Sequence, residues 1–333
     1  MRSGKIIAIL MAALLCVTAF VSCDKGEDEK EKPAVYYNIA FETAGGGKID
    51  PRTVKEGTTL TEPPEPLRDG YVFDGWYNGT KHWDFTYTVK EDMTLTAHWV
   101  AADNVFTHSP AVDGETTVIT GIKDGKKREN IKLPTYIGGY RVTAVGEGAF
   151  SKLSSEEVKS ITVPAGVTSI GNNAFEEAVN IEIIIEGEIS HVGEKAFFGC
   201  TGLKSIKFGE VIETIAPEAF AGSGLGMVIL PRSVKVVDEN AFFECESLKI
   251  LILHDSVESV KDMAFENSAL ESVLFYGTGE TFKILLETKM SSKNGKILDA
   301  DKYIYSEAKP TEAVPEGCSG FWHFNGKGEP KAW

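Results

Sequence analysis

The strongest pattern of apolar and polar positions in this chain is a sixfold recurrence of the dipeptide Ala-Phe. The pairs begin at Ala149, Ala174, Ala196, Ala219, Ala241 and Ala264, separated by 25, 22, 23, 22 and 23 residues. Such a period is too short for a repeat of two helices, but it fits a coil of one strand and one short helical turn. The pattern therefore predicts stacked coils over residues 141–278.

Five of the six coils also share an internal pattern, with apolar residues at the start, three residues on and five residues on, as at Leu203, Ile206 and Phe208. The last two lie two residues apart, so they face the same side of a strand. The coil that begins at Ile181 is one residue shorter before its Ala-Phe pair. We expect the Phe of each pair to fill the coil interior, giving a structural core of Phe150, Phe175, Phe197, Phe220, Phe242 and Phe265. No coil closes a core alone, so stacking supplies the stability.

The outward positions of the last three coils form a candidate binding face. These positions are Met227, Ile229, Ile250, Ile252 and Leu274, with Tyr276 just beyond them. Exposed apolar patches of this kind often mark interaction sites. Two alternatives remain open: another segment covers the strip, with residues 279–302 as the first choice, or the side chains form a ladder that favours strands.

Residues 34–101 alternate as antiparallel β structure does. One face of a first strand carries Val35, Tyr37, Ile39 and Phe41, and a second strand is expected at residues 52–55. A module this small has a thin core, and large rings can fill it with few side chains. We interpret Phe73, Trp76, Phe85 and Trp99 as that core, with an aromatic platform for sugars or peptides as the alternative.

Two family resemblances rest on these residues. The repeat unit L-x-x-I-x-L-P-x-x-V-x-x-I-x-x-x-A-F-x-x-C-x-x-L resembles the leucine-rich repeat of the BspA-like bacterial surface family. Residues 70–77, GYVFDGWY, together with 94–99, TLTAHW, resemble the internalin B-repeat. The resemblances imply an α+β repeat protein: a leucine-rich-repeat solenoid of short parallel strands and short helical turns, preceded by a small β-rich, β-grasp-like module.

The same resemblances divide the rest of the chain. Residues 102–140 are expected to lead into the solenoid, with strands at residues 116–122 and 131–134. Residues 279–333 resemble the closing segment of the BspA-like family, which we interpret as a cap over the apolar end of the last coil. The implied role is cell-surface binding, or adhesion to host matrix or other bacteria.

The N-terminus has the pattern of a targeting segment. Arg2 and Lys5 precede an apolar run, and Val21-Ser22-Cys23 resembles the lipobox of bacterial lipoproteins. On this interpretation, residues 1–22 are a signal peptide and Cys23 is the lipidated residue. Residues 23–33, which start at Cys23, form a disordered acidic tether. The resemblance implies an outer-membrane lipoprotein of a Gram-negative bacterium, exposed at the cell surface. An ordinary secretory signal and an uncleaved anchor are the alternatives.

The net charge and the residues able to carry out chemistry exclude several classes of function. A formal net charge of −15 argues against nucleic acid as a partner, because nucleic-acid binding requires a basic surface, and limits membrane contact to the lipid anchor. The histidines show no metal-ligand spacing, and nucleophile-elbow and phosphate-loop motifs are lacking. Cys200 and Cys245 occupy one repeat position two coils apart, roughly 10 Å, which exceeds the reach of a disulfide.

These observations predict a non-catalytic cell-surface lipoprotein without cofactor or metal. Its coil array is expected to present a surface for adhesion, with a protein, a host-matrix component or a bacterial surface ligand as partner. A structural spacer and an auxiliary glycan-binding lipoprotein of a nutrient-uptake system are the alternatives. A glycan site requires exposed aromatic rings along one face, and the outward positions supply only Tyr276.

Overall fold

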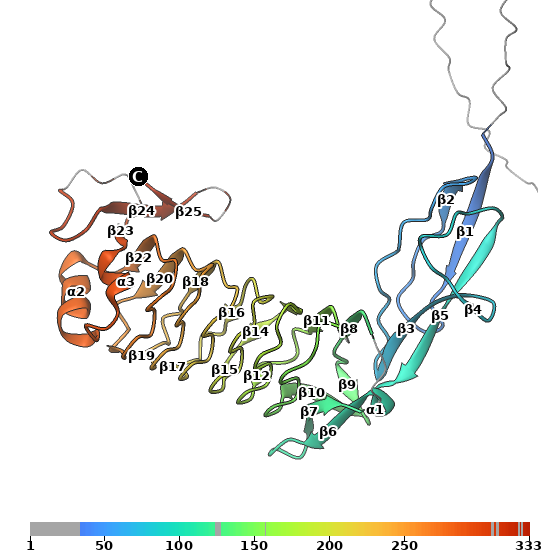
Figure 1. Cartoon of the computed structure of the whole chain (residues 1–333), viewed down its shortest axis with the longest axis horizontal. Helices are drawn as coiled ribbons and strands as arrows, with labels where there is room; N and C mark the ends of the chain where they lie inside the picture. Colours follow the sequence, from blue (N-terminus) through green and yellow to red (C-terminus); the bar gives the residue numbers. More distant parts are fainter. Residues whose placement is uncertain are drawn as a thin grey trace, which may run out of the picture.

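The computed structural model consists of an N-terminal sheet joined at an angle to a long array of coils (Figure 1). It describes residues 34–123, 128–156, 158–307, 310, 313–325, 327 and 329–333. The predicted signal peptide, Cys23 and the whole of the tether therefore lie outside the described residues.

The N-terminal module is a mixed five-stranded sheet in the order β2-β1-β5-β3-β4. Its strands are β1 (Tyr36–Glu42), β2 (Arg52–Lys55), β3 (Tyr71–Asn78), β4 (Lys81–His82) and β5 (Met93–Ala101). The central strands β1 and β5 are parallel, and the other pairs are antiparallel. The second strand lies at the residues that the sequence predicts.

Large rings fill the core of this module, as the small size of the sheet requires. Trp76 is buried, and its ring meets Phe41 and Phe73 edge-on, at centroid distances of 5.1 and 5.5 Å. Phe85 and Trp99 are half-buried against the same cluster. These four predicted rings therefore pack inward and do not form an open platform.

A one-turn helix, α1 (Ala102–Val105), joins the module to the array. Ala102 and Val105 are fully buried and belong to the array's core, as does Val72 of β3. The strands β6 (Phe106–Pro110) and β7 (Thr116–Ile122) follow as an antiparallel pair. The joint is thus packed from both sides.

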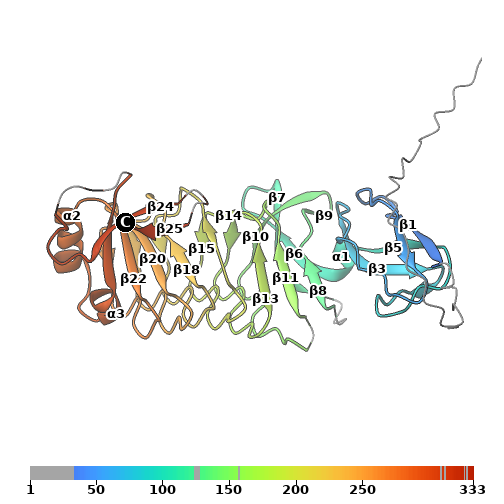
Figure 2. The same ribbon diagram turned by 90° about the horizontal axis from the view of Figure 1, so that it is seen from above.

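The array consists of two rows of short parallel strands (Figure 2). The row that forms the sheet face holds β8 (Asn130–Lys132), β11 (Ser160–Val163), β13 (Glu182–Ile185), β14 (Glu188–Ile189), β16 (Lys207–Phe208), β18 (Met227–Ile229), β20 (Ile250–His254) and β22 (Ser272–Tyr276). The second row holds β10 (Tyr140–Val145), β12 (Ser169–Ile170), β15 (His191–Val192), β17 (Thr214–Ile215), β19 (Val236–Val237) and β21 (Ser259–Val260), with β9 (Tyr136–Ile137) beside β10. β8 pairs in parallel with β11, so the row begins within the predicted lead-in.

The six Phe residues of the Ala-Phe pairs form one continuous stack in the interior. All six are at most 2% exposed, and neighbouring ring centroids lie 5.0–5.4 Å apart. The Phe N–H of each coil donates to the Ala carbonyl of the next coil at 2.7–2.9 Å, from Phe150 to Phe242. Stacked rings and a backbone ladder therefore run along the same line.

The Ala-Phe segments fold into tight turns, and the prediction of short helical turns is wrong. Residues on both sides of each pair have positive φ, as at Asn173 (53°) and Glu177 (56°). A left-handed residue interrupts the succession of right-handed residues that a helix needs. The i→i+3 bond from the N–H of Glu176 to the carbonyl of Asn173 therefore closes a turn that does not propagate.

The last coil is closed by the segment α2 (Gly279–Ile284), η1 (Leu285–Lys289) and α3 (Gly295–Asp299). Phe282 stacks on Phe275 at 4.5 Å, and Ile297 is fully buried. Asn294, also fully buried, accepts the Phe265 N–H at 3.1 Å, in place of the carbonyl that a further coil would supply.

The chain then adds β23 (Asp301–Tyr305), β24 (Gly320–Phe324) and β25 (Pro330–Ala332) to the sheet. β23 and β24 are parallel to β22, and β25 folds back antiparallel to β24. Ile304 and Phe321 face the array's core, so the predicted cap over its end includes these strands.

Candidate functional site

The sheet face of the late coils brings the predicted binding residues into rows. Parallel pairing sets Met227 beside Ile250, Ile229 beside Ile252, and Ile252 beside Leu274. Because side chains alternate along a strand, these residues share one face.

The strip is only partly exposed, which corrects the expectation of a continuous apolar face. Met227 is 37% and Ile229 is 42% exposed, whereas Ile252 is 0% and Leu274 is 6% exposed. Ile250 and Tyr276 are half-buried. The coil of β18 therefore keeps its apolar side chains open, and the next two coils do not.

The cover comes from β24, and not from residues 279–302. Trp322 is fully buried and forms one cluster with Ile252 and Leu274. Its indole Nε1–H donates to the carbonyl of Phe275 at 3.5 Å. The strands β24 and β25 pass over the sheet face in both views (Figures 1 and 2).

An aromatic cluster lies at the end of the strip, of which sequence reasoning found only Tyr276. Its ring stacks on His254 at 4.5 Å and lies 4.3 Å from Tyr305, 4.9 Å from Trp322 and 6.4 Å from Phe324. The run Phe321-Trp322-His323-Phe324 was the available signal, but the sequence does not show that β24 crosses the face.

Burial sets the charge states in this cluster. It raises the pKa of Tyr276 to about 12, with Tyr305 adding to the effect. It lowers the pKa of His254 to about 4, and the charge of Arg232 acts in the same direction. At neutral pH both rings are therefore uncharged and pack as apolar groups.

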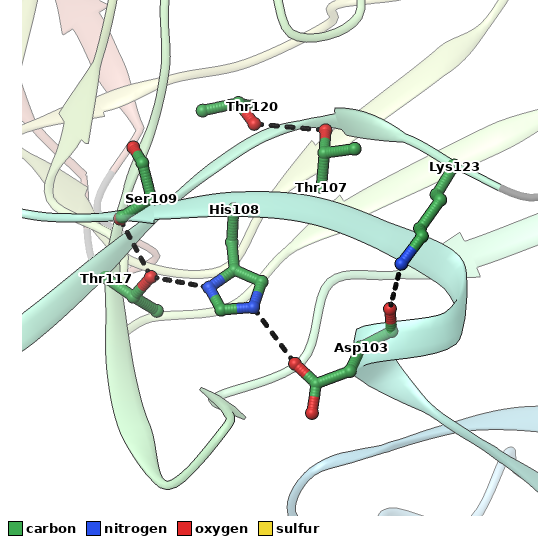
Figure 3. Close-up of polar contacts among 7 residues, drawn as sticks. All are labelled: Asp103, Thr107, His108, Ser109, Thr117, Thr120 and Lys123. Atoms are coloured by element: carbon green, nitrogen blue, oxygen red, sulfur yellow. Dashed lines mark hydrogen bonds and ion pairs between the residues drawn. The ribbon is translucent and has the colours of Figure 1, made fainter.

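A polar network near the joint has the outline of an acid–base–hydroxyl relay (Figure 3). His108 Nε2 lies 3.0 Å from Asp103 Oδ1, and its Nδ1 lies 3.1 Å from Thr117 Oγ1. The Thr117 hydroxyl is buried and donates to the Ser109 carbonyl at 2.9 Å. A hydroxyl that is inaccessible and already bonded is a poor nucleophile, so the network ties α1 to β6 and β7.

The described cysteines are free and two of them serve packing. The thiols of Cys200 and Cys245 donate to the carbonyls of Phe175 and Phe220 at 2.9 and 3.1 Å. Burial raises their pKa values to about 12 and about 11, so both stay protonated at neutral pH. In the part of the chain that the structure describes, no cluster of three His, Cys, Asp or Glu side chains could hold a metal ion.

Over the described ranges, no helix combines the length and apolar character that crossing a bilayer requires. The lipidation residue, Cys23, stays a prediction from the sequence.

Comparison with known families identifies both parts of the chain. Residues 125–225 and 181–284 match the BspA type leucine-rich repeat region (six copies), and residues 37–98 match the Listeria–Bacteroides repeat domain. These matches confirm the two resemblances drawn from the sequence. A protein of Evansella cellulosilytica, named as a Gly-rich membrane protein, is 42% identical over 67 residues, which are 19% of this chain and 8% of that protein.

Solved structures of leucine-rich repeat proteins are also similar. One from Bacteroides ovatus has a TM-score of 0.46 and 23% identity, covering 65% of this chain and 59% of that one. The Treponema pallidum leucine-rich repeat protein has a TM-score of 0.35 and 26% identity, with coverage of 51% and 68%. This chain thus spans less than a tenth of the Evansella protein and somewhat over half of the Bacteroides one.

Proposed function

We propose that this chain, which belongs to the BspA-type leucine-rich repeat proteins, is a non-catalytic cell-surface protein whose array binds a partner through its sheet face. The observation that carries the proposal is the open apolar pair Met227 and Ile229 on the sheet face of the β18 coil. Large apolar side chains left exposed in a row are typical of interaction surfaces. Protein ligands are the favoured partners, with glycans as the alternative.

Surface location rests on the N-terminal pattern. A lipobox at Cys23 supplies a membrane anchor, and the Evansella relative is named as a membrane protein. Several acyl chains hold a protein durably at a bilayer, whereas one does not. Palmitate labelling in the native host tests the anchor: label is expected on the intact chain and absent from Cys23→Ala. Equal labelling of both chains contradicts lipidation at this residue.

Ligand binding is tested with the chain from residue 24 onward, which retains every described residue. We expect saturable binding to a protein in a panel of matrix proteins, bacterial surface proteins and glycans. Reversing exposed charges on the sheet face, Glu182→Lys with Lys207→Glu, should weaken that binding. The matched pair Lys152→Glu with Glu177→Lys, an inter-coil ion pair on the turn side, should leave it unchanged.

A structural spacer is the second candidate, and the packed joint favours it. Ala102 and Val105 are buried in the core that Val72 of the module also enters, so the module and the array are held at a fixed angle. A spacer tolerates both pairs of charge reversals and binds nothing on the panel. Binding to glycans alone would favour the third candidate function, a glycan-binding lipoprotein of a nutrient-uptake system.

A further inference from the structure

The C-terminal strand β24 shows which side chain the late sheet face accepts. Trp322 is fully buried on Ile252 and Leu274, and Phe324 meets its ring edge-on at 5.1 Å. The face therefore takes a large ring carried by an extended segment. No ion pair is needed, because burial of apolar area drives such a contact.

The same row continues one coil further without a cover. Ile229 pairs with Ile252 in register, and Met227 pairs with Ile250. We call Met227 and Ile229 the open strip. The strands β24 and β25 run over β20 toward β18, where the open strip begins (Figures 1 and 2). Its chemistry is thus continuous with that of the covered part.

We propose that the open strip binds an extended segment of a partner protein that places a large aromatic side chain on Met227 and Ile229. The proposal rests on the proposed function and names the residues and the kind of partner. It follows from the continuity between the open strip and the contact that Trp322 makes within this chain. The bound segment would lie next to the paired strands β24 and β25 and extend the aromatic layer by one coil.

The partner is a different protein and not a second copy of this chain. The aromatic strand that fits the face is β24, and Trp322 has no exposed area in its own chain. A second copy therefore has no free β24 to offer. Homotypic binding would require each copy to lose its own buried contact first.

The test uses the chain from residue 24 onward and a labelled synthetic peptide with the sequence of residues 319–333, as a probe of the same chemistry. Fluorescence anisotropy is expected to show saturable binding. Ile229→Asp should weaken it at least tenfold, because the change places a charge in an apolar contact. Ser205→Asp, exposed in the preceding coil, should change it less than twofold. A peptide carrying W322A should also bind at least tenfold more weakly.

Several results would overturn the proposal. They are absence of saturable binding, equal affinity for Ile229→Asp, and equal affinity of the W322A peptide. A peptide that merely exchanges with the chain's own β24 is insensitive to Ile229→Asp and falls in the same group. Self-association that Ile229→Asp abolishes would assign the strip to a second copy instead.

Two controls keep the outcome interpretable. Ile229→Ser, expected to weaken peptide binding severalfold, replaces Ile229→Asp if circular dichroism shows that the aspartate variant unfolds. A panel protein whose binding survives Ile229→Asp leaves the proposed function standing and overturns only this inference.

Discussion

The N-terminal module and the coil array both rely on aromatic cores, but they arrange the rings in different ways. In the module, Trp76 and Trp99 meet Phe73 edge-on, at interplanar angles of 66° and 65°. In the array, successive Phe rings are nearly parallel, at 5–23°. Edge-on contacts can close a cluster on itself, whereas a parallel stack continues until another structure ends it.

The difference shows where each part needs special residues. The module needs no residues to end its core, since its strands enclose one cluster. The array needs ends: α1 with β6 and β7 at one, and the segment from α2 to α3 at the other. Asn294 is the clearest case, because it replaces a backbone carbonyl with a side-chain one. Periodic folds thus place non-periodic residues where the period stops.

The largest expected effect comes from breaking the stack at its centre. Phe220 lies between Phe197 and Phe242 and also meets Phe208. Phe220→Ala should lower the free energy of unfolding of the array by about 3–5 kcal/mol through the cavity it leaves. Urea unfolding followed by circular dichroism measures the loss. The half-buried neighbour Phe243 supplies the control, since Phe243→Ala should cost clearly less.

Trp76→Ala is the corresponding test in the N-terminal module. It removes the central ring of the module and should destabilise the module by a similar amount, while the array's transition stays in place. A single joint transition shifted equally by both variants would contradict two separately built cores.

The next largest effect should come from the end of the array. Asn294→Ala removes the acceptor for the Phe265 N–H and the amide donor that reaches the carbonyls of Lys261 and Ser291, at 2.8 and 3.2 Å. Unsatisfied buried polar groups cost about 1–3 kcal/mol each, so we expect a loss of roughly 2–3 kcal/mol. Hydrogen exchange should localise it to the last coil. Asn130→Ala, an exposed control that loses one bond from Ser160, should cost less than 1 kcal/mol.

Periodicity in the sequence was sufficient to predict the stacked interior, because burial repeats with the apolar residues that cause it. It was not sufficient for the turn conformation. Lys195, Glu218 and Met263 have positive φ. Because these residue types ordinarily avoid that conformation, the sequence does not indicate it. The backbone hydrogen bonds between neighbouring coils impose these positive φ angles. Local sequence propensity does not predict such tertiary contacts.

The candidate site was predictable only in part for a related reason. The outward positions of β18, β20 and β22 follow from strand alternation. Whether they meet water depends on where residues 320–324 return in space, and no local pattern encodes that. The short coil at Ile181 is similar: its missing residue was visible, but the division into β13 and β14, with β14 pairing to β16, follows from the neighbouring coil.

The aromatic cluster should make the late coils sensitive to acid. Burial holds the pKa of His254 at about 4, below its ordinary 6.5. The unfolded chain therefore takes up a proton first as pH falls, so the stabilisation present above pH 6.5 is lost between there and pH 4. We expect a loss of at most about 3 kcal/mol. His254→Phe should flatten this part of the pH dependence of urea unfolding, and an unchanged slope would contradict the assignment.

The smallest expected effect is a gain in stability at a turn. Met263 has a φ of 53°, at the position where the preceding coil has Asn240 at 55°. Asparagine tolerates left-handed backbone better than an unbranched apolar residue does. Met263→Asn should therefore raise the array's free energy of unfolding by about 0.5–1 kcal/mol, measured by urea unfolding. The reverse exchange, Asn240→Met, should lower it by a similar amount, because both residues occupy equivalent turns. If both exchanges destabilise, side-chain packing and not backbone conformation decides this position.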